Sequence, residues 1–326
     1  QTTTLQDWVE ESIPATSGMP GFWQGCATFG RMRDPAGPTI VLEHGPYAAE
    51  VVGVGAALRS LTHDGRDLVA GWPAGEICPD YRGWVLQPWP NRVGDGRYDF
   101  DGATHQLAWT EPEHGNALHG LVGWVRWEAH QPDPARARFH HELVPQAGYP
   151  FALDLRVDYR LGDDGLHVAV TATNVGDRPA PYGAGHHPYL TVDRPADDLE
   201  LTLPARTWCE MDDRGLPGPA QPIDETAYDF RSARRIGDLV LDHPFGGLTD
   251  APAVLRDPES GREITLHLGE GCRWLHVFTC DTHDPARRAV AIEPMSCPPD
   301  AFRTGADLVA LEPGESHRLA FTLTGS

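Results

Sequence analysis

The chain has 326 residues, with 47 Asp or Glu against 26 Lys or Arg, which gives a formal net charge of −21. A surface of this sign repels polyanions, so we expect neither nucleic acid nor an anionic membrane as a partner. Hydrophobic residues make up 40% of the chain, and 35 Gly and 30 Pro supply many turns, which favours numerous short strands over long helices. The charge also favours a neutral, polar small molecule as the ligand.

Residues 1–37 differ in pattern from the rest of the chain. They contain a predicted short helix around residues 5–12, followed by sequence without a clear period. We expect an N-terminal extension over residues 1–37, packed on a single main domain over residues 38–326.

The composition also gives expectations about compartment and assembly. No window approaches the roughly 20 apolar residues of a membrane helix, and the first 30 residues show no basic start followed by an apolar run. The six cysteines are scattered without C-x-x-C spacing, which indicates neither a zinc site nor a disulfide framework. We expect a reduced, cytoplasmic protein that is a monomer or a weak homodimer.

Strand signals begin at about Thr39. Residues 40–42 and 49–61 are apolar stretches separated by a turn at residues 44–46. Residues 151–161 alternate apolar and mostly charged side chains, and residues 166–173 alternate again after a Gly-Asp-Asp-Gly turn, which predicts an antiparallel hairpin. Further predicted strands are at 199–203, 264–268, 274–279, 289–292 and 319–323. Because strands do not alternate with helices, we predict an all-β fold, a large antiparallel β-sandwich.

Three segments carry side chains suited to acid–base chemistry. They are Gly183-Ala184-Gly185-His186-His187-Pro188-Tyr189-Leu190, Asn116-Ala117-Leu118-His119-Gly120 and Ala291-Ile292-Glu293-Pro294-Met295. Histidine titrates nearest neutrality, so an imidazole in a cleft can give or take a proton at working pH. Two imidazoles and one carboxylate make a candidate acid–base site.

Five motifs in this order resemble those of the aldose 1-epimerase (galactose mutarotase) family, from about Thr39 to the C-terminus. They are residues 87–102 with Asn91-Arg92-Val93, Asn116-Ala117-Leu118-His119-Gly120, His187-Pro188-Tyr189, Leu241-Asp242-His243-Pro244-Phe245 and Ile292-Glu293-Pro294. The resemblance implies a galactose mutarotase-like supersandwich and an isomerase that interconverts the α and β anomers of an aldose. It implies no cofactor and no metal.

The resemblance also implies a role for individual residues. His187 would be the general acid and Glu293 the general base, and the residues expected to bind the sugar are Arg92, His119, Asp242, Asn91, Tyr189 and Phe278. The chemistry leads to the same division, because opening the ring requires one proton delivered to the ring oxygen and another removed from the anomeric hydroxyl. Aromatic side chains suit the C–H faces of a sugar, and the candidates for stacking are Trp84, Trp89, Tyr189 and Phe278.

The doublet His186-His187 poses an ambiguity, since adjacent residues of a strand point to opposite faces. Only one of the two can face the sugar, and the His-x-Tyr register favours His187. After Glu-Pro the chain continues with Met295-Ser296-Cys297, where galactose mutarotases commonly carry Gln or Thr, so the identity of the aldose stays open.

Two other classes of protein are compatible with these residues. One is a catalytically silent carbohydrate-binding protein of the same fold, because fold alone does not fix function. The other is a metal-dependent enzyme that uses His119, His187 and Glu293 as ligands. The close His spacing typical of such metal sites is missing, which disfavours the second class.

Overall fold

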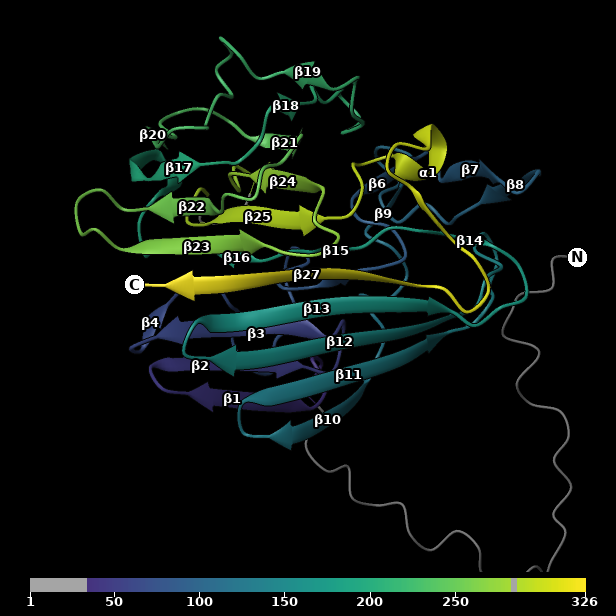
Figure 1. The fold of residues 1–326 in the computed structure, drawn as a ribbon, viewed down its shortest axis with the longest axis horizontal. Helices are drawn as coiled ribbons and strands as arrows, with labels where there is room; N and C mark the ends of the chain where they lie inside the picture. Colours follow the sequence, from purple (N-terminus) through teal and green to yellow (C-terminus); the bar gives the residue numbers. More distant parts are fainter. Residues whose placement is uncertain (1–33, 283–285) are drawn as a thin grey trace, which may run out of the picture. The chain divides into compact units, whose positions relative to one another are not determined.

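A computed structural model of the chain describes residues 34–282 and 286–326 (Figure 1). The described part consists mostly of strands and turns, with a 3-10 helix, η2, at Ala196–Asp198 and a single-turn helix, α1, at Ala301–Thr304. The helix predicted around residues 5–12, and with it residues 1–33 of the predicted extension, lie outside the described residues. In the described part of the chain, no helix has the length and apolar character needed to cross a bilayer.

Most strands belong to three sheets. The four-stranded sheet has the order β1 (Thr39–His44), β2 (Tyr47–Val52), β3 (Ala57–His63) and β4 (Arg66–Asp67). The nine-stranded sheet has the order β10 (Glu128–Asp133), β11 (Arg136–Leu143), β12 (Leu153–Gly162), β13 (Gly165–Asn174), β27 (Ser316–Gly325), β23 (Glu263–Leu268), β22 (Ala253–Arg256), β17 (Glu200–Thr202) and β20 (Arg234–Arg235).

The third sheet has eight strands. Its order is β19 (Gln221–Pro222), β18 (Thr207–Trp208), β21 (Asp242–Gly246), β24 (Trp274–Phe278), β25 (Val290–Met295), β15 (Gly185–His186) and β5 (Val85–Leu86), and β16 (Tyr189–Leu190) pairs with β25 as well. Three short pairs complete the fold: β6 (Arg92–Gly94) with β9 (Asn116–Leu118), β7 (Arg97–Phe100) with β8 (Ala103–Gln106), and β14 (Ala180–Tyr182) with β26 (Val309–Leu311). The ladders within the sheets are antiparallel, so the predicted all-β class is confirmed.

The predicted hairpin forms the centre of the nine-stranded sheet. β12 pairs with β13 without a register shift, from Leu153 opposite Asn174 to Gly162 opposite Gly165. Its inward side chains, such as Val157 and Val168, are buried, and the alternate positions point outward. The period of two in the sequence therefore predicted both the pairing and the buried face.

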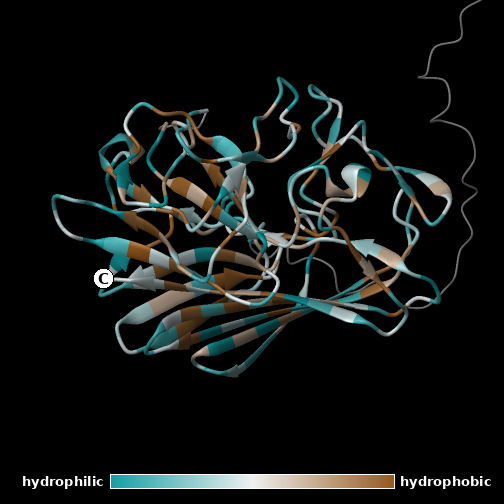
Figure 2. Ribbon diagram, turned by 45° about the horizontal axis from the view of Figure 1, so that its top comes forward, coloured by the Kyte–Doolittle hydropathy of each residue, from teal (hydrophilic) through white to brown (hydrophobic). Residues whose placement is uncertain are grey.

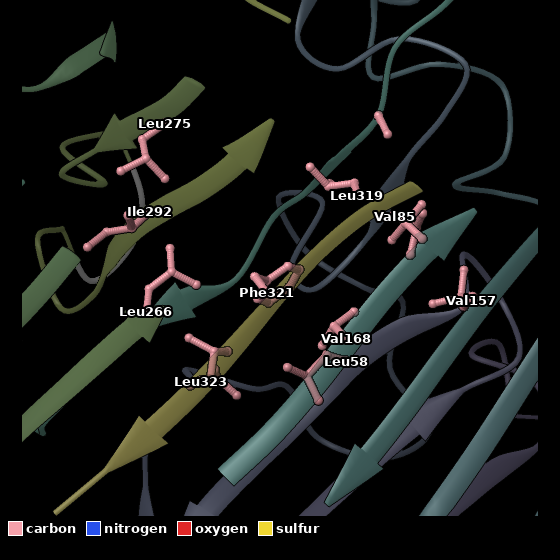
Figure 3. Close-up of a cluster of buried hydrophobic side chains, with 14 of the residues drawn as sticks. Leu58, Val85, Val157, Val168, Leu266, Leu275, Ile292, Leu319, Phe321 and Leu323 are labelled. Carbon is pink, nitrogen blue, oxygen red and sulfur yellow. The ribbon is translucent and has the colours of Figure 1, made fainter. Parts of the chain in front are cut away.

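A shared apolar core lies between the sheets. Figure 3 shows side chains from β13 and β27 of the nine-stranded sheet meeting side chains from β24 and β25 of the eight-stranded sheet and from β3 of the four-stranded sheet. The colouring of Figure 2 shows the apolar residues gathered on these inner strands. Burial of this surface contributes most of the stabilisation, at roughly 25 cal/mol per Å² of apolar area removed from water.

One face of the eight-stranded sheet packs on the core, and the opposite face does not. Leu275, Val277 and Ile292 of β24 and β25 point into the core. Because side chains alternate along a strand, the residues between them on β24 and β25 point to the other face. That second face carries His276, Phe278 and Glu293.

Candidate active site

A cleft of about 590 Å³ opens on the second face of the eight-stranded sheet. It is lined by residues of β21, β24 and β25 together with segments that follow β4, β5, β9 and β18. All eight predicted site residues lie in its lining: His187, Glu293, Arg92, His119, Asp242, Asn91, Tyr189 and Phe278. Residues from all five motifs thus meet in one place.

His187 and Glu293 face each other in the cleft. The Nε2 atom of His187 lies 3.3 Å from Oε1 of Glu293, and the side chains are 5% and 2% exposed. The His187 ring stacks on Tyr189, with the ring centroids 4.8 Å apart and the planes 6° from parallel. Tyr189 in turn donates its hydroxyl hydrogen to the carbonyl of Asp80 at 2.8 Å. The imidazole is therefore held in one orientation against the carboxylate.

Glu293 is poised to exchange a proton near neutral pH. Burial, which disfavours the charged form, raises the pKa of Glu293 to about 7, and the charge of Asp242 adds to this rise. The charges of His276 and Arg92 act in the opposite direction. A carboxyl group with this pKa can serve as a base that is ionised and protonated in turn.

His119 is fixed as a hydrogen-bond donor. The backbone N–H of Asn91 donates to Nδ1 of His119 at 3.2 Å, which places the proton of the neutral imidazole on Nε2. Burial lowers the pKa of His119 well below its ordinary value, and His187 and Arg92 lower it further. Both residues of this contact adopt left-handed backbone conformations, with φ of 53° at Asn91 and 59° at His119.

Arg92 is anchored by a carboxylate that the sequence did not reveal. Its Nε and Nη2 atoms donate to Glu111 at 2.9 and 2.8 Å, and Asn116 donates to the same carboxylate at 2.9 Å. Although burial opposes it, these hydrogen bonds lower the pKa of Glu111, which stays ionised. Two of the guanidinium nitrogens are thereby bound to Glu111, which fixes the plane of the guanidinium group.

Asp242 is held by a second buried imidazole. Nε2 of His276 lies 2.6 Å from Oδ1 of Asp242, and the side chains are 1% and 45% exposed. Burial acts to raise the pKa of Asp242, but the bond and charge of His276 lower it on balance. Asp242 is thus an ionised acceptor at the edge of the cleft.

The structure resolves the His186-His187 ambiguity. His186 is fully buried away from the cleft, where Nε2 lies 3.0 Å from the hydroxyl oxygen of Tyr159. That hydroxyl donates to the carbonyl of Ala56, so Nε2 of His186 is the donor to it. Burial lowers the pKa of His186 to about 3. His187 is the residue of the doublet that lines the cleft.

The prediction that Trp84 and Trp89 stack on a sugar is wrong. Trp84 is 3% exposed in a cluster with Trp72 and Leu86, and Trp89 is 2% exposed against Phe302. Both indole rings are part of the apolar core, because burying a large apolar side chain is favourable wherever it fits. Tyr189 and Phe278 do line the cleft, and Tyr189 packs beneath His187.

Among the lining residues that sequence reasoning did not name as site residues are Tyr81, Glu111, His243 and His276. His276 carried a usable signal, since it stands two residues before Phe278 on a predicted strand and so shares its face. Glu111 lies outside the named strands, and no pattern of the sequence marks it.

The described residues contain no group of three or more His, Cys, Asp or Glu side chains arranged to hold a metal ion. His119, His187 and Glu293 were the ligand set of the metal-dependent alternative. In the structure Nδ1 of His119 is occupied by a backbone N–H, and His187 contacts Glu293 directly. These contacts favour an acid–base arrangement of the three side chains.

Comparison with known proteins assigns the chain to a family. The model of the aldose 1-epimerase family matches residues 38–324. The chain therefore belongs to the aldose 1-epimerase family, and the resemblance drawn from the five motifs is confirmed.

Relatives are similar over most of the chain. The uncharacterized protein YihR of Escherichia coli K12 is 35% identical over 293 residues, which is 89% of this chain and 94% of that protein. The aldose 1-epimerase of the same organism is 28% identical over 226 residues, 62% of each chain. Among solved structures, the GalM/aldose epimerase homologue from C. elegans shares the fold with a TM-score of 0.79 at 23% identity, covering 89% of this chain and 99% of that one.

Proposed function

We propose that this protein is an aldose 1-epimerase, an isomerase that interconverts the α and β anomers of a free, neutral aldose. The observation that carries this proposal is the buried pair of His187 and Glu293, 3.3 Å apart in the cleft. The family assignment and the pKa of Glu293 near 7 support it.

The pair can open and close the ring without a covalent intermediate. Ionised Glu293 removes the proton of the anomeric hydroxyl while protonated His187 gives a proton to the ring oxygen, so the C1–O5 bond breaks and C1 becomes an aldehyde. After rotation about the C1–C2 bond, neutral His187 takes the proton of the O5 hydroxyl as O5 attacks C1, and protonated Glu293 returns a proton to the aldehyde oxygen. Both side chains end in their starting states.

The other lining residues can hold the sugar while this occurs. The Nε2–H group of His119 and the remaining nitrogen of Arg92 offer donors, and the Asp242 carboxylate offers an acceptor. Positioning of this kind accounts for a large part of enzymatic rate enhancement.

The charge of the cleft supports a neutral substrate. Of the described residues that line it, one is an arginine, already bound to Glu111, and seven are carboxylates: Asp80, Glu111, Glu113, Asp212, Asp213, Asp242 and Glu293. Such a lining repels the phosphate or carboxylate of an anionic sugar. The hydroxyls of an unmodified aldose suffer no such repulsion.

The experiment is an NMR exchange measurement of anomer interconversion across a panel of neutral aldoses and sugar phosphates. We expect acceleration for at least one neutral aldose and a loss of kcat on the order of 10²–10⁴ in Glu293→Gln, with sugar binding nearly intact. A protein that binds sugars but accelerates none of them would instead be the catalytically silent carbohydrate-binding alternative.

A further inference from the structure

Three strands of the eight-stranded sheet bring two carboxylates and an imidazole onto one face. In the ladder register, His276 of β24 lies directly opposite Glu293 of β25, and Phe278 lies opposite Asp242 of β21. Because alternate residues share a face, Asp242, His276 and Glu293 all point toward the cleft. His276 therefore stands between the two carboxylates, next to the base on one side and diagonal to Asp242 on the other.

The two ring nitrogens of His276 have different surroundings. Its Nε2 atom is 2.6 Å from the Asp242 carboxylate, which is a short hydrogen bond. The described residues supply no hydrogen-bond partner for its Nδ1 atom or for Oε2 of Glu293, and both atoms are buried. His276 thus affects Glu293 in two ways: through an electrostatic interaction, and through the hydrogen bond that holds Asp242 in position.

Asp242 and Glu293 are two carboxylates on the same face of the sheet, and their negative charges repel each other. The Asp242 charge raises the pKa of Glu293, whereas the His276 charge lowers it. The Asp242 side chain is 45% exposed, so without its bond to His276 it is free to turn toward water. The charged and titratable groups that line the cleft with Glu293 include Arg92, Glu111, His119, His187, Asp242, His243 and His276, and the same lining also contains Asp80, Glu113, His114, Asp212 and Asp213.

We propose that His276 is a positioning residue for the reaction, which holds Asp242 in the cleft as an acceptor for a sugar hydroxyl and offsets the repulsion between Asp242 and Glu293. The inference rests on the proposed function and assigns a role to a residue outside the five motifs. It makes the Asp242–His276 pair a device that limits the electrostatic repulsion on the neighbouring base.

The test is the pH dependence of anomer exchange in His276→Gln and His276→Leu. Removing the imidazole, whose charge lowers the pKa of Glu293, moves the acid limb of kcat/KM to higher pH. In the Gln variant we therefore expect about a tenfold fall at pH 6, against a change within about threefold at pH 8.5, and a similar ratio between the two pH values in the Leu variant. The Leu variant also loses the bond to Asp242, so its KM should rise at least about threefold above that of the Gln variant.

A matched control exists on the nine-stranded sheet. His140 forms a similar bond to Asp154, at 2.7 Å, but its side chain is 39% exposed and does not line the cleft. His140→Gln should keep the wild-type rates at both pH values. An equal pH shift in this control would overturn the assignment.

Two results separate the inference from the proposed function. Absence of exchange in wild-type protein for every aldose would defeat the proposed function itself. Wild-type exchange with unchanged pH profiles in folded His276 variants would defeat only the role of His276, as would a uniform loss at all pH values. Circular dichroism establishes folding. If the Leu variant does not fold, the Gln variant alone decides the matter through its rate ratio between pH 6 and pH 8.5.

Discussion

Charged side chains are exposed to solvent on the nine-stranded sheet but buried on the cleft face of the eight-stranded sheet. On β12 the charged residues, such as Arg156, alternate outward into solvent, and the inward positions are apolar. On β24 and β25, His276 and Glu293 are each only 1% exposed. Burying ionisable groups costs stability unless their partners compensate, and Glu293 still has an oxygen without a partner among the described residues. The first arrangement serves stability, and the second is of the kind that is found at functional sites.

The largest effect we expect separates the two adjacent histidines. His187→Asn should lower kcat on the order of 10²–10⁴, because the ring oxygen loses its proton donor. His186→Asn should lower kcat less than about tenfold but reduce the free energy of unfolding by roughly 1–3 kcal/mol, because the buried Tyr159 hydroxyl oxygen loses the N–H group that donates to it. NMR exchange rates and denaturant unfolding of both variants provide the measurement. A greater kcat loss in His186→Asn would reverse the two assignments.

The second prediction concerns how much the buried Glu293 carboxyl group changes the free energy of unfolding with pH. A carboxyl group whose folded pKa is about 7, against 4.5 when unfolded, stabilises the fold below pH 4.5 and loses that contribution as pH rises to 7. Glu293→Gln removes this dependence. Its stability relative to wild type should therefore increase by up to about 3 kcal/mol between pH 4.5 and pH 7. Urea unfolding at a series of pH values measures the difference, and a constant difference would show that folding leaves the pKa of Glu293 at its ordinary value.

A smaller effect concerns the loop that covers Arg92. Gly215 has φ of 69°, and a Cβ atom there would come within 2.7 Å of the Arg92 guanidinium. Gly215→Ala should displace Arg92 and raise KM about three- to tenfold, with kcat less affected. Gly237→Ala is the matched control, since its φ is 62° and nothing lies within 4 Å of the added Cβ. Equal KM values in the two variants would show that backbone strain alone is responsible.

The sequence predicted regular regions better than the cleft. The period of two in the sequence predicted the β12–β13 hairpin, because the two strands are adjacent in the chain and each shows the alternation by itself. Short strands such as β5, β15 and β16 have two residues each, too few for a period to show. The motifs located His187 and Glu293, but the bond between Asp242 and His276 joins residues 34 positions apart through the register of β21 and β24. Long-range pairing of this kind is not visible in a local pattern.

The proposed reaction depends on buried Glu293 acting as a base with a pKa near 7. The most direct measurement is the pH dependence of kcat/KM for anomer exchange in wild-type protein, recorded by NMR from pH 5 to pH 8. Because the base must be ionised, the rate should fall about tenfold per pH unit below pH 7. A profile that stays flat down to pH 5 would contradict the claim, since it would place the essential carboxyl group at its ordinary pKa or exclude it from the reaction.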